Sequence, residues 1–419
     1  MKYSYLFLLL SSCSFFIDRF DKDLLEEKGV ATKSQTKQTH CEIIQKNILI
    51  AESENTVQQY QKFLAKISNR LNLKFIDRVV LWSLIQMNAR PDLSSPTAKL
   101  QVFLSYQNKD YFYNAFSKEN DGYPQLYLLE QLLKDFNSRY SLNDLISIYD
   151  RYFPAQLTVT KDFEDFLAKN QLAIKKNQVL NDNYIRGDES LKEGETLPKV
   201  SFQKLFRLYR KTNMRQYEIS NFLFKSQTSK EISSACNFEM SLYQNSIFLI
   251  NDELLKSHTY GLKTGDNMFI AASSQSNIEI KPVGSLPFFF GHSNSRSAAM
   301  CHLKNQESNA QMWFVSSQSR DPGQHIFHLM EYGLEEIDNI KALDTMVKFS
   351  RHQFLKNPVR LVIESRRSSD KQIEELLKLN IPIYNSKKLG KIWGYFDYKK
   401  QKTFLLDDRR EGHIECSSN

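Results

Sequence analysis

The histidines of the C-terminal half are the first residues whose type and spacing could do chemistry. His325 and His328 lie one helical turn apart on a helix predicted from about Gln324, and Glu331 follows one turn later. Imidazole and carboxylate are both zinc ligands, so these side chains could form a metal-binding face. A structural zinc site needs four ligands, however, and the sequence offers no fourth partner. We therefore predict no metal and no cofactor.

A second group contains His302 and Lys304, separated by one residue and followed by Asn309, a predicted strand and the serine-rich residues 316–319. This arrangement resembles half of the phospholipase D superfamily motif, in which His-x-Lys, four residues and Asp precede a strand that ends in Gly-Ser-x-Asn. The resemblance implies that His302 attacks phosphorus, that Lys304 holds phosphate oxygens, and that Ser317 makes a further phosphate contact.

The sequence departs from that motif at several positions. Asn309 stands where Asp is expected, and Ser316 and Ser319 replace Gly and Asn. The nearest second copy has Leu389 at the histidine position and keeps Lys391 as a phosphate ligand. Without a second histidine the leaving group loses its usual proton donor, which costs about 10²- to 10⁴-fold in rate. This resemblance predicts a degenerate, weakly active or inactive phosphodiesterase-like domain.

The N-terminus has the order of residues found in a secretory signal. Lys2 gives a positive start, and residues 3–10 form an uninterrupted apolar and aromatic stretch. A membrane-spanning helix needs about 20 apolar residues, so this stretch is too short to span. Two small residues, Ser11 and Ser12, then precede Cys13.

The segment from Leu10 to Cys13 resembles the lipobox of bacterial lipoproteins. The resemblance implies that residues 1–12 are removed as a signal peptide and that Cys13 carries acyl chains, each buried methylene contributing about 0.8 kcal/mol to membrane binding. The membrane is then the expected partner. Because Ser14 stands where many inner-membrane lipoproteins carry Asp, the outer membrane of a bacterial cell envelope is favoured. The alternative is an ordinary secretory signal with an incidental cysteine.

The remaining cysteines form an even set: Cys41, Cys236, Cys301 and Cys416. In an exported protein such a set predicts disulfides, and three pairings are possible. We favour Cys236 with Cys301, because both lie in strand-like segments of the same half. Cys41 would then join Cys416 as a clasp between the ends. Free buried thiols are the alternative.

Composition is that of a folded globular body, with 41% hydrophobic and 25% charged residues. The net charge is +8, and removal of Lys2 with the signal lowers it by one. The basic residues are dispersed, so we expect no specific nucleic-acid partner. An anionic ligand or another envelope protein remains a possible partner.

The chain divides by pattern into an N-terminal helical domain and a mixed α/β C-terminal domain. Residues 13–40 are polar and predict a tether, 41–177 show helical spacing, 178–199 predict a linker, and 200–419 are mixed. Within the last segment we expect strands at 246–250, 268–272, 277–280, 298–302, 311–316, 359–364, 381–384, 392–396 and 403–406, and helices at 202–211, from 324, and at 371–379.

Two classes of function fit these patterns. The preferred prediction is a membrane-anchored envelope lipoprotein with a binding or scaffolding role. The alternative is the degenerate phospholipase D-like domain, in which His302 and Lys304 would have to open into a cleft that faces Lys391.

Overall fold

The structure is a computed structural model of the full chain. It describes residues 40–42, 47–118, 122–154, 156–221, 227–228, 232–238, 257–275, 277–292, 298–305, 310–319, 321–331, 344–345, 347–355, 359–386, 389–398, 401–409 and 412–417. Three predictions concern residues outside these ranges: the signal peptide, the lipidation of Cys13, and the strand at 246–250. Among the described helices, none combines the length and the apolar character needed to cross a membrane.

Two antiparallel sheets dominate the part of the chain that the structure describes, each with seven strands there. The first sheet has the order β21-β2-β10-β11-β3-β4-β7, and the second has the order β1-β20-β19-β15-β14-β9-β8. The strands of the first sheet are β2 (Asn47–Ala51), β3 (Lys99–Tyr106), β4 (Lys109–Ser117), β7 (Tyr217–Asn221), β10 (Ser257–Thr264), β11 (Asn267–Ser274) and β21 (His413–Ser417). Those of the second are β1 (His40–Glu42), β8 (Gln227–Thr228), β9 (Ile232–Cys236), β14 (Ala298–Asn305), β15 (Gln311–Ser317), β19 (Lys391–Tyr398) and β20 (Gln401–Leu406).

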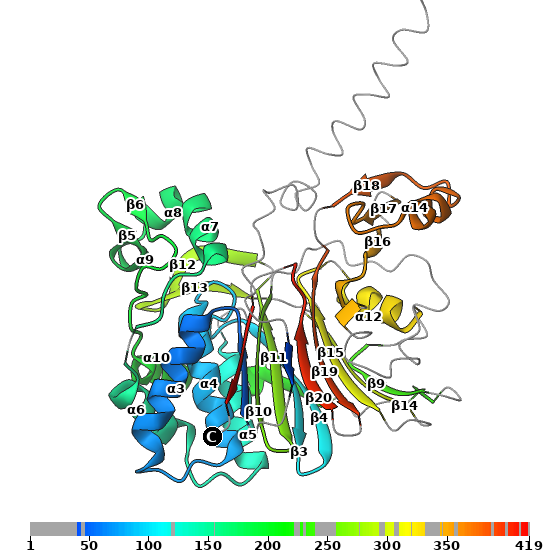
Figure 1. Ribbon diagram of the computed structural model, residues 1–419. Coiled ribbons are helices and arrows are strands. Elements are labelled where there is room, and N and C mark those ends of the chain that lie inside the picture. Colours follow the sequence, from blue (N-terminus) through cyan, green and yellow to red (C-terminus); the bar gives the residue numbers. More distant parts are fainter. Residues whose placement is uncertain are drawn as a thin grey trace, which may run out of the picture.

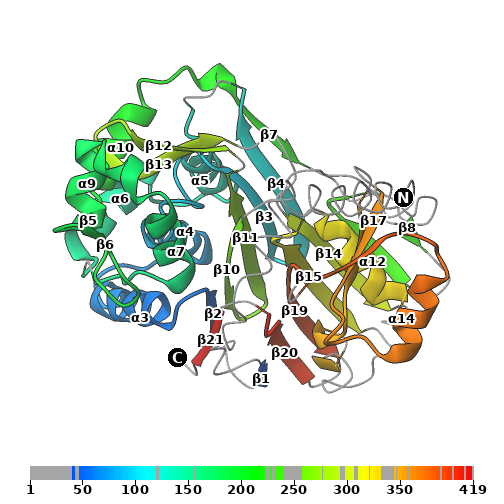
Figure 2. The ribbon, with the colours of Figure 1, turned by 90° about the horizontal axis from the view of Figure 1, so that it is seen from above.

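The sheets pack face to face with helices outside them, so that the molecule has four layers (Figures 1 and 2). An apolar cluster fills the space between the sheets, with Ile270 and Ile50 from the first sheet and Val315 and Trp393 from the second. Residues alternate between the two faces of each strand, so this cluster shows which side chains point into the layer between the sheets. Polar residues that lie two or four positions from these apolar residues on the same strand also point into this layer.

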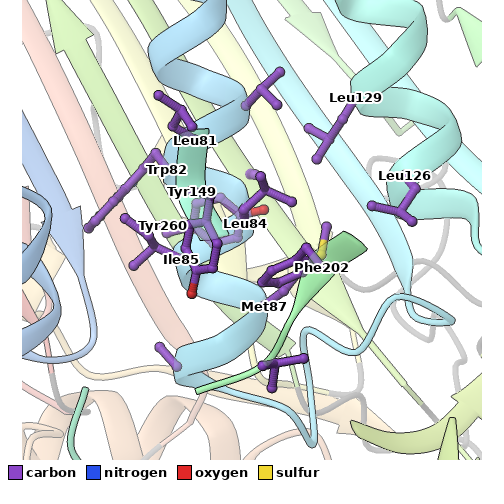
Figure 3. Close-up of a cluster of buried hydrophobic side chains, with 14 of the residues drawn as sticks. Leu81, Trp82, Leu84, Ile85, Met87, Leu126, Leu129, Tyr149, Phe202 and Tyr260 are labelled. Atoms are coloured by element: carbon purple, nitrogen blue, oxygen red, sulfur yellow. The ribbon is translucent and has the colours of Figure 1, made fainter. Parts of the chain in front are cut away.

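Helices cover the outer face of the first sheet and form the largest core with it (Figure 3). Trp82 is fully buried in this core, and its indole nitrogen donates a hydrogen bond to the carbonyl of Gly261, 3.0 Å away. The helices are α3 (Glu54–Ser68), α4 (Phe75–Ala89), α5 (Pro124–Asp135), α6 (Leu142–Tyr152), α7 (Lys161–Lys169), α8 (Gln171–Lys175), α9 (Gln178–Tyr184) and α10 (Phe202–Tyr209). The hairpins β5 (Ile185–Arg186) with β6 (Glu189–Ser190) and β12 (Asn277–Val283) with β13 (Leu286–His292) lie beside them (Figure 1).

The outer face of the second sheet is covered by α12 (Pro322–Glu331). This helix opens a long insertion between β15 and β19, which are themselves paired neighbours. The rest of the insertion is a small unit at the upper right of Figure 1. It contains β16 (His352–Leu355), β17 (Arg360–Ile363), α14 (Asp370–Leu377) and β18 (Ile383–Asn385).

The mixed α/β class predicted from the sequence is confirmed, but the first sheet draws its strands from both sides of the predicted domain boundary. Helices do prevail between residues 41 and 177, yet β2, β3 and β4 lie in that stretch. The predicted linker 178–199 contains α9 and the β5–β6 hairpin, with Leu180 and Tyr184 buried. The two halves therefore share one sandwich among the described residues.

Candidate active site

The layer between the sheets changes from apolar to polar at the end where β10 and β19 begin. Along β19, Trp393 and Tyr395 belong to the interlayer core, and Lys391 occupies the next position on the same face. Along β11, Ala272 belongs to the core and Ser274 follows it on that face. On both strands, therefore, the first polar side chain on this face is only two residues from the last apolar one. We call this the polar end and define it by Glu52, Ser257, Thr259, Ser317 and Lys391.

Ser257 is the first residue of β10 and lies directly across from Ser274 of β11. It is fully buried, and its hydroxyl has no hydrogen-bond partner among the described residues. Its carbonyl oxygen accepts a hydrogen bond of 2.9 Å from the side-chain amide of Gln318. A buried hydroxyl without a partner loses its hydration and gains nothing in return. The hydroxyl of Ser274 is in the same situation, and Ser257 differs from Ser274 in being the first residue of its strand.

The turn that follows β10 explains the register of this strand. Thr264 pairs with Asn267, so Gly265 and Asp266 form a two-residue hairpin loop. Gly265 has a φ of +57°, a left-handed conformation that glycine adopts without steric cost. Because the tight turn fixes the pairing of β10 with β11, it also fixes which face Ser257 presents.

Thr259 follows Ser257 on the same face and connects the two sheets. Its hydroxyl lies 3.1 Å from that of Ser317, at the end of β15 in the second sheet. Ser317 pairs in turn with Lys391 across β15 and β19. The start of β10 is therefore held against the site residues of the opposite sheet.

Glu52 carries the negative charge of the polar end. It is one residue beyond β2, and its carboxylate accepts a hydrogen bond from Nη1 of Arg90. Nδ1 of His258 lies 3.0 Å from the same carboxylate, and Nζ of Lys391 lies 4.0 Å from it. Burial raises the pKa of Glu52, but His258, Arg90 and Lys391 outweigh burial and hold this pKa well below its usual value. Glu52 is a permanent anion in the neutral range.

Arg90 is fixed by two carboxylates. Its Nε and Nη2 each donate a hydrogen bond of 2.9 Å to Asp92, in a bidentate arrangement, while Nη1 binds Glu52. Burial lowers the pKa of the Arg90 guanidinium, but Asp92 and Glu52 raise it well above its ordinary value. The two carboxylates and the guanidinium are almost fully buried, so the charges compensate one another without water.

His258 is next to Ser257 in sequence but points the other way. Alternation places it on the helix-facing side of β10, where its Nε2 lies 2.8 Å from the side-chain oxygen of Gln86. Its Nδ1 faces Glu52. Both ring nitrogens of His258 thus face other groups, and His258 makes no hydrogen bond to the hydroxyl of Ser257.

The predicted phosphate site is divided between the two ends of the layer. Ser317 and Lys391 pair with each other at the polar end. His302 pairs with Trp313, four residues along the strand from Ser317, which corresponds to about 13 Å. His302 and Lys304 therefore do not open into a cleft with Lys391. Leu389 is buried in the core of the insertion, and Asn309 lies outside the described residues.

The opposite end of the layer is built around His302. Its ring stacks on Trp313 with centroids 4.3 Å apart and planes 9° apart. Its Nδ1 lies 2.7 Å from the carboxylate of Asp110, which belongs to β4 of the first sheet. We call Asp110, His302, Lys304 and Trp313 the histidine end. The contacts of His302 join the two sheets.

Two of the cysteines are joined to each other. Cys236 and Cys301 lie opposite each other on β9 and β14 and form a disulfide, the pairing favoured from the sequence. The side chains of Cys41 and Cys416 lie outside the described residues, so their pairing stays a prediction. His325 and His328, the helical histidines considered as metal ligands, are buried. No group of three potential ligands is placed to hold a metal in the described part of the chain.

Sequence reasoning missed Ser257, Glu52 and Arg90. The residues from 257 to 274 carry a hairpin signal, since two strand-like runs flank Gly265 and Asp266. That signal identifies Ser257 as the start of a strand. The proximity of Glu52 and Lys391 has no local signal, because the two residues lie on different sheets and are 339 positions apart.

No protein-family model matches the sequence, and no curated protein matches it. Solved structures do share the fold. Two structures of the protein LmbA2991 have TM-scores of 0.68 and 0.67, each at 9% identity, and each covers 91% of this chain and 100% of its own. A cephalosporin acylase from Bacillus halodurans has a TM-score of 0.62 at 9% identity and covers 94% of this chain and 99% of its own.

This likeness corrects the function predicted from the sequence. A binding or scaffolding role does not agree with a chain that shares its fold with an acylase over 94% of its length. The phospholipase D-like alternative is also wrong, because the strands of the C-terminal half complete a sandwich with those of the N-terminal half. His302, its supposed nucleophile, bonds to Asp110 and stacks on Trp313 instead. The chain shares its fold with a solved cephalosporin acylase, and the polar end is the candidate active site.

Proposed function

We propose that this protein is a hydrolase that cleaves an amide bond and uses the hydroxyl of Ser257 as its nucleophile. One observation carries the proposal: the first residue of β10 is a buried serine whose hydroxyl has no partner among the described residues, at the polar end of a fold shared with a solved acylase. A serine hydroxyl is a weak nucleophile by itself and needs a base.

The base would be the α-amino group of Ser257 itself. Among the described residues, no imidazole or carboxylate is hydrogen-bonded to this hydroxyl, and His258 faces the other way. A terminal amine has an ordinary pKa of about 7.7–8.0, so it is partly neutral at neutral pH and can accept a proton. An N-terminal amine is an established type of activating base for a hydroxyl nucleophile. The proposal therefore requires the chain to be cut between Lys256 and Ser257.

The cut can be made by the same hydroxyl. Its oxygen would attack the carbonyl carbon of Lys256, the peptide C–N bond would break, and the nitrogen of Ser257 would keep the pair of electrons and take up the proton that the hydroxyl loses. In this first step the departing nitrogen is thus the proton acceptor, because the free amine forms only afterwards. Water would then hydrolyse the resulting ester, leaving a carboxyl group on Lys256 and a free amine on Ser257. Lys391 would supply positive charge for the oxyanion that forms in both reactions.

The lipid anchor remains a separate proposal. It is supported by the order of Lys2, the apolar residues 3–10, Ser11 and Ser12 before Cys13. We propose that the enzyme is held on a membrane of the bacterial envelope through Cys13, the outer membrane being favoured. Intact mass of the membrane-purified protein tests this: acyl chains on a mature chain that begins at Cys13 are expected, and they should be lost in Cys13→Ala. An unmodified Met1 would contradict it.

The function is tested by mass spectrometry of the purified chain after incubation at neutral pH. We expect two fragments whose boundary lies between Lys256 and Ser257, and an intact chain for Ser257→Ala. Ser316→Ala is the matched control, since Ser316 is also a buried serine without a hydroxyl partner among the described residues but faces α12. It should be cut like the wild type. A wild-type chain that stays intact, or a cut Ser257→Ala chain, would contradict the proposal.

A further inference from the structure

The long insertion begins and ends at residues of the polar end. The chain leaves the second sheet after Ser317 and returns to it at Lys391, and these two residues are paired neighbours. Lys391 is almost fully buried, and its ammonium lies 4.5 Å from the centre of the Trp393 ring. Any group that fixes the end of the insertion therefore also fixes the position of this lysine.

A buried network of four charged residues lies at that point. Arg351 and Glu364 belong to the insertion, whereas Asp407 and Arg409 follow β20 of the second sheet. Arg409 donates hydrogen bonds of 2.7 and 2.6 Å to the two oxygens of Glu364 and one of 3.0 Å to Asp407. Arg351 lies 2.6 Å from the other oxygen of Asp407. We call these four residues the clamp.

The clamp holds the backbone on both sides of Lys391. The amide of Leu389 donates to Glu364 over 2.6 Å, and its carbonyl accepts from Arg351 over 2.8 Å. On the other side, the amide of Ile392 donates to Asp407 over 3.2 Å. Leu389, two residues before Lys391, and Ile392, the residue after it, are thus bound by opposite halves of the clamp.

Gly390 completes this connection. It has a φ of +62°, and a side chain there would meet the ring of His325 and the carbonyl of Ser317 at 3.0–3.1 Å. The backbone before Lys391 therefore passes too close to α12 and β15 for another residue. The clamp, α12 and β15 together leave this stretch little room to move.

The clamp contains equal numbers of basic and acidic residues. Two guanidinium groups face two carboxylates, so the network is neutral as a whole and can be buried. Burial raises the pKa of Asp407, but Arg351 and Arg409 lower it to about 2. Burial and the neighbouring Arg409 lower the pKa of Arg351 to about 10. Arg351 and Asp407 therefore both stay charged near neutrality, which suits a structural support rather than a switch.

We infer that the clamp is a positioning device that holds the ammonium of Lys391 beside Glu52 in the polar end. Its catalytic consequence rests on the proposed function, but the position of Lys391 does not. The clamp touches neither Ser257 nor Glu52 in any contact described above. It acts on the site through the backbone of Leu389 and Ile392.

The test measures how fast Lys391 is acetylated by acetic anhydride, by peptide mass spectrometry of the full-length protein. Glu364→Gln removes one charge of the clamp, and we expect Lys391 to be acetylated more than tenfold faster. Asp408→Asn is the matched control, since Asp408 lies in the same region but forms only a partly exposed ion pair with Arg367. It should leave Lys391 as protected as in the wild type.

A second control separates positioning from general loss of stability. Leu145→Ala removes a buried side chain in the helical layer, far from the clamp in the fold. Compared at a temperature equally far below each melting point, Leu145→Ala should keep Lys391 protected and Glu364→Gln should not. Arg409→Lys, which keeps the charge but gives up the bidentate contact, should show a smaller increase and serves if Glu364→Gln does not fold.

The inference is overturned if Lys391 stays protected in the clamp variants, or if Leu145→Ala exposes it equally. The outcome is independent of the proposed nucleophile. If Ser257 proves unreactive while Lys391 still responds to the clamp, the positioning stands and the hydrolase proposal fails. If Ser257 reacts and Lys391 does not respond, the reverse holds.

Discussion

The two ends of the layer between the sheets contain similar types of side chain in different surroundings. At the polar end, Glu52 and Lys391 are 4% and 1% exposed, and the charges are compensated by other protein groups. At the histidine end, His302 and Asp110 are 16% and 24% exposed. Coulomb interactions and unsatisfied hydroxyls have much larger consequences where water is excluded. Residue type alone, therefore, does not identify the end where chemistry takes place.

The largest difference between the ends is expected in reactivity. Ser257→Ala should abolish the cut before residue 257, because the attacking oxygen is removed. His302→Ala should leave its rate within about twofold of the wild type, since His302 lies at the other end of the strands. Timed mass spectra of both variants give the rates. Loss of the cut in His302→Ala would indicate that the reaction takes place at the histidine end, which contradicts the proposal.

Stability should show the next largest difference. Arg90→Met leaves the buried carboxylates Glu52 and Asp92 without their shared cation, and removing one partner of a buried ion pair costs about 3–5 kcal/mol. Asp110→Asn at the partly exposed histidine end should cost less than about 1 kcal/mol. Urea unfolding of the two variants measures both values. Equal losses would mean that burial does not distinguish the two ends.

The dependence of stability on pH sharpens the comparison. The pKa of Glu52 in the folded chain lies well below its unfolded value of 4.5, because His258, Arg90 and Lys391 outweigh the effect of burial. The stabilisation from its charge is therefore fully present above pH 4.5 and is lost as the pH falls through the folded pKa. We expect the destabilisation caused by Glu52→Gln to be constant from pH 7 to about 5 and to shrink below pH 4.5. A loss that shrinks already at neutral pH would contradict a permanently ionised Glu52.

A small effect on stability is also expected from the stacked ring at the histidine end. His302→Ala removes the contact with Trp313 and the hydrogen bond with Asp110, and we expect a loss of about 1 kcal/mol, typical of an aromatic pair. Urea unfolding beside the Arg90→Met variant measures the difference. A loss as large as that of Arg90→Met would show that His302 is a main support of the sandwich.

The sequence predicted the elements of the C-terminal half far better than those of the N-terminal half. The expected strands at 268–272 and 311–316 correspond to β11 and β15, and the helix at 371–379 corresponds to α14. Strand β3 was missed because most of it is buried on both faces, which removes the alternation of polar and apolar residues. It also pairs with β11, more than 150 residues later, and no local pattern reports such a partner.

The candidate site was only partly predictable for the same reason. Ser317 and Lys391 were selected through a motif resemblance, and they do lie together at the polar end. The motif also selected His302 and Lys304, whose strand carries them to the other end. Ser257, Glu52 and Lys391 come from three distant segments, so only the folded sandwich places them at one end.

The most direct test of the central claim is to map the residue that a serine-reactive fluorophosphonate probe modifies in the full-length, cut protein. We predict one adduct on the fragment that begins at Ser257, located on Ser257 itself, with no adduct in Ser257→Ala and an unchanged adduct in Ser316→Ala. A probe that labels a different residue, or a folded and cut protein that takes up none, would contradict the assignment of Ser257 as the nucleophile.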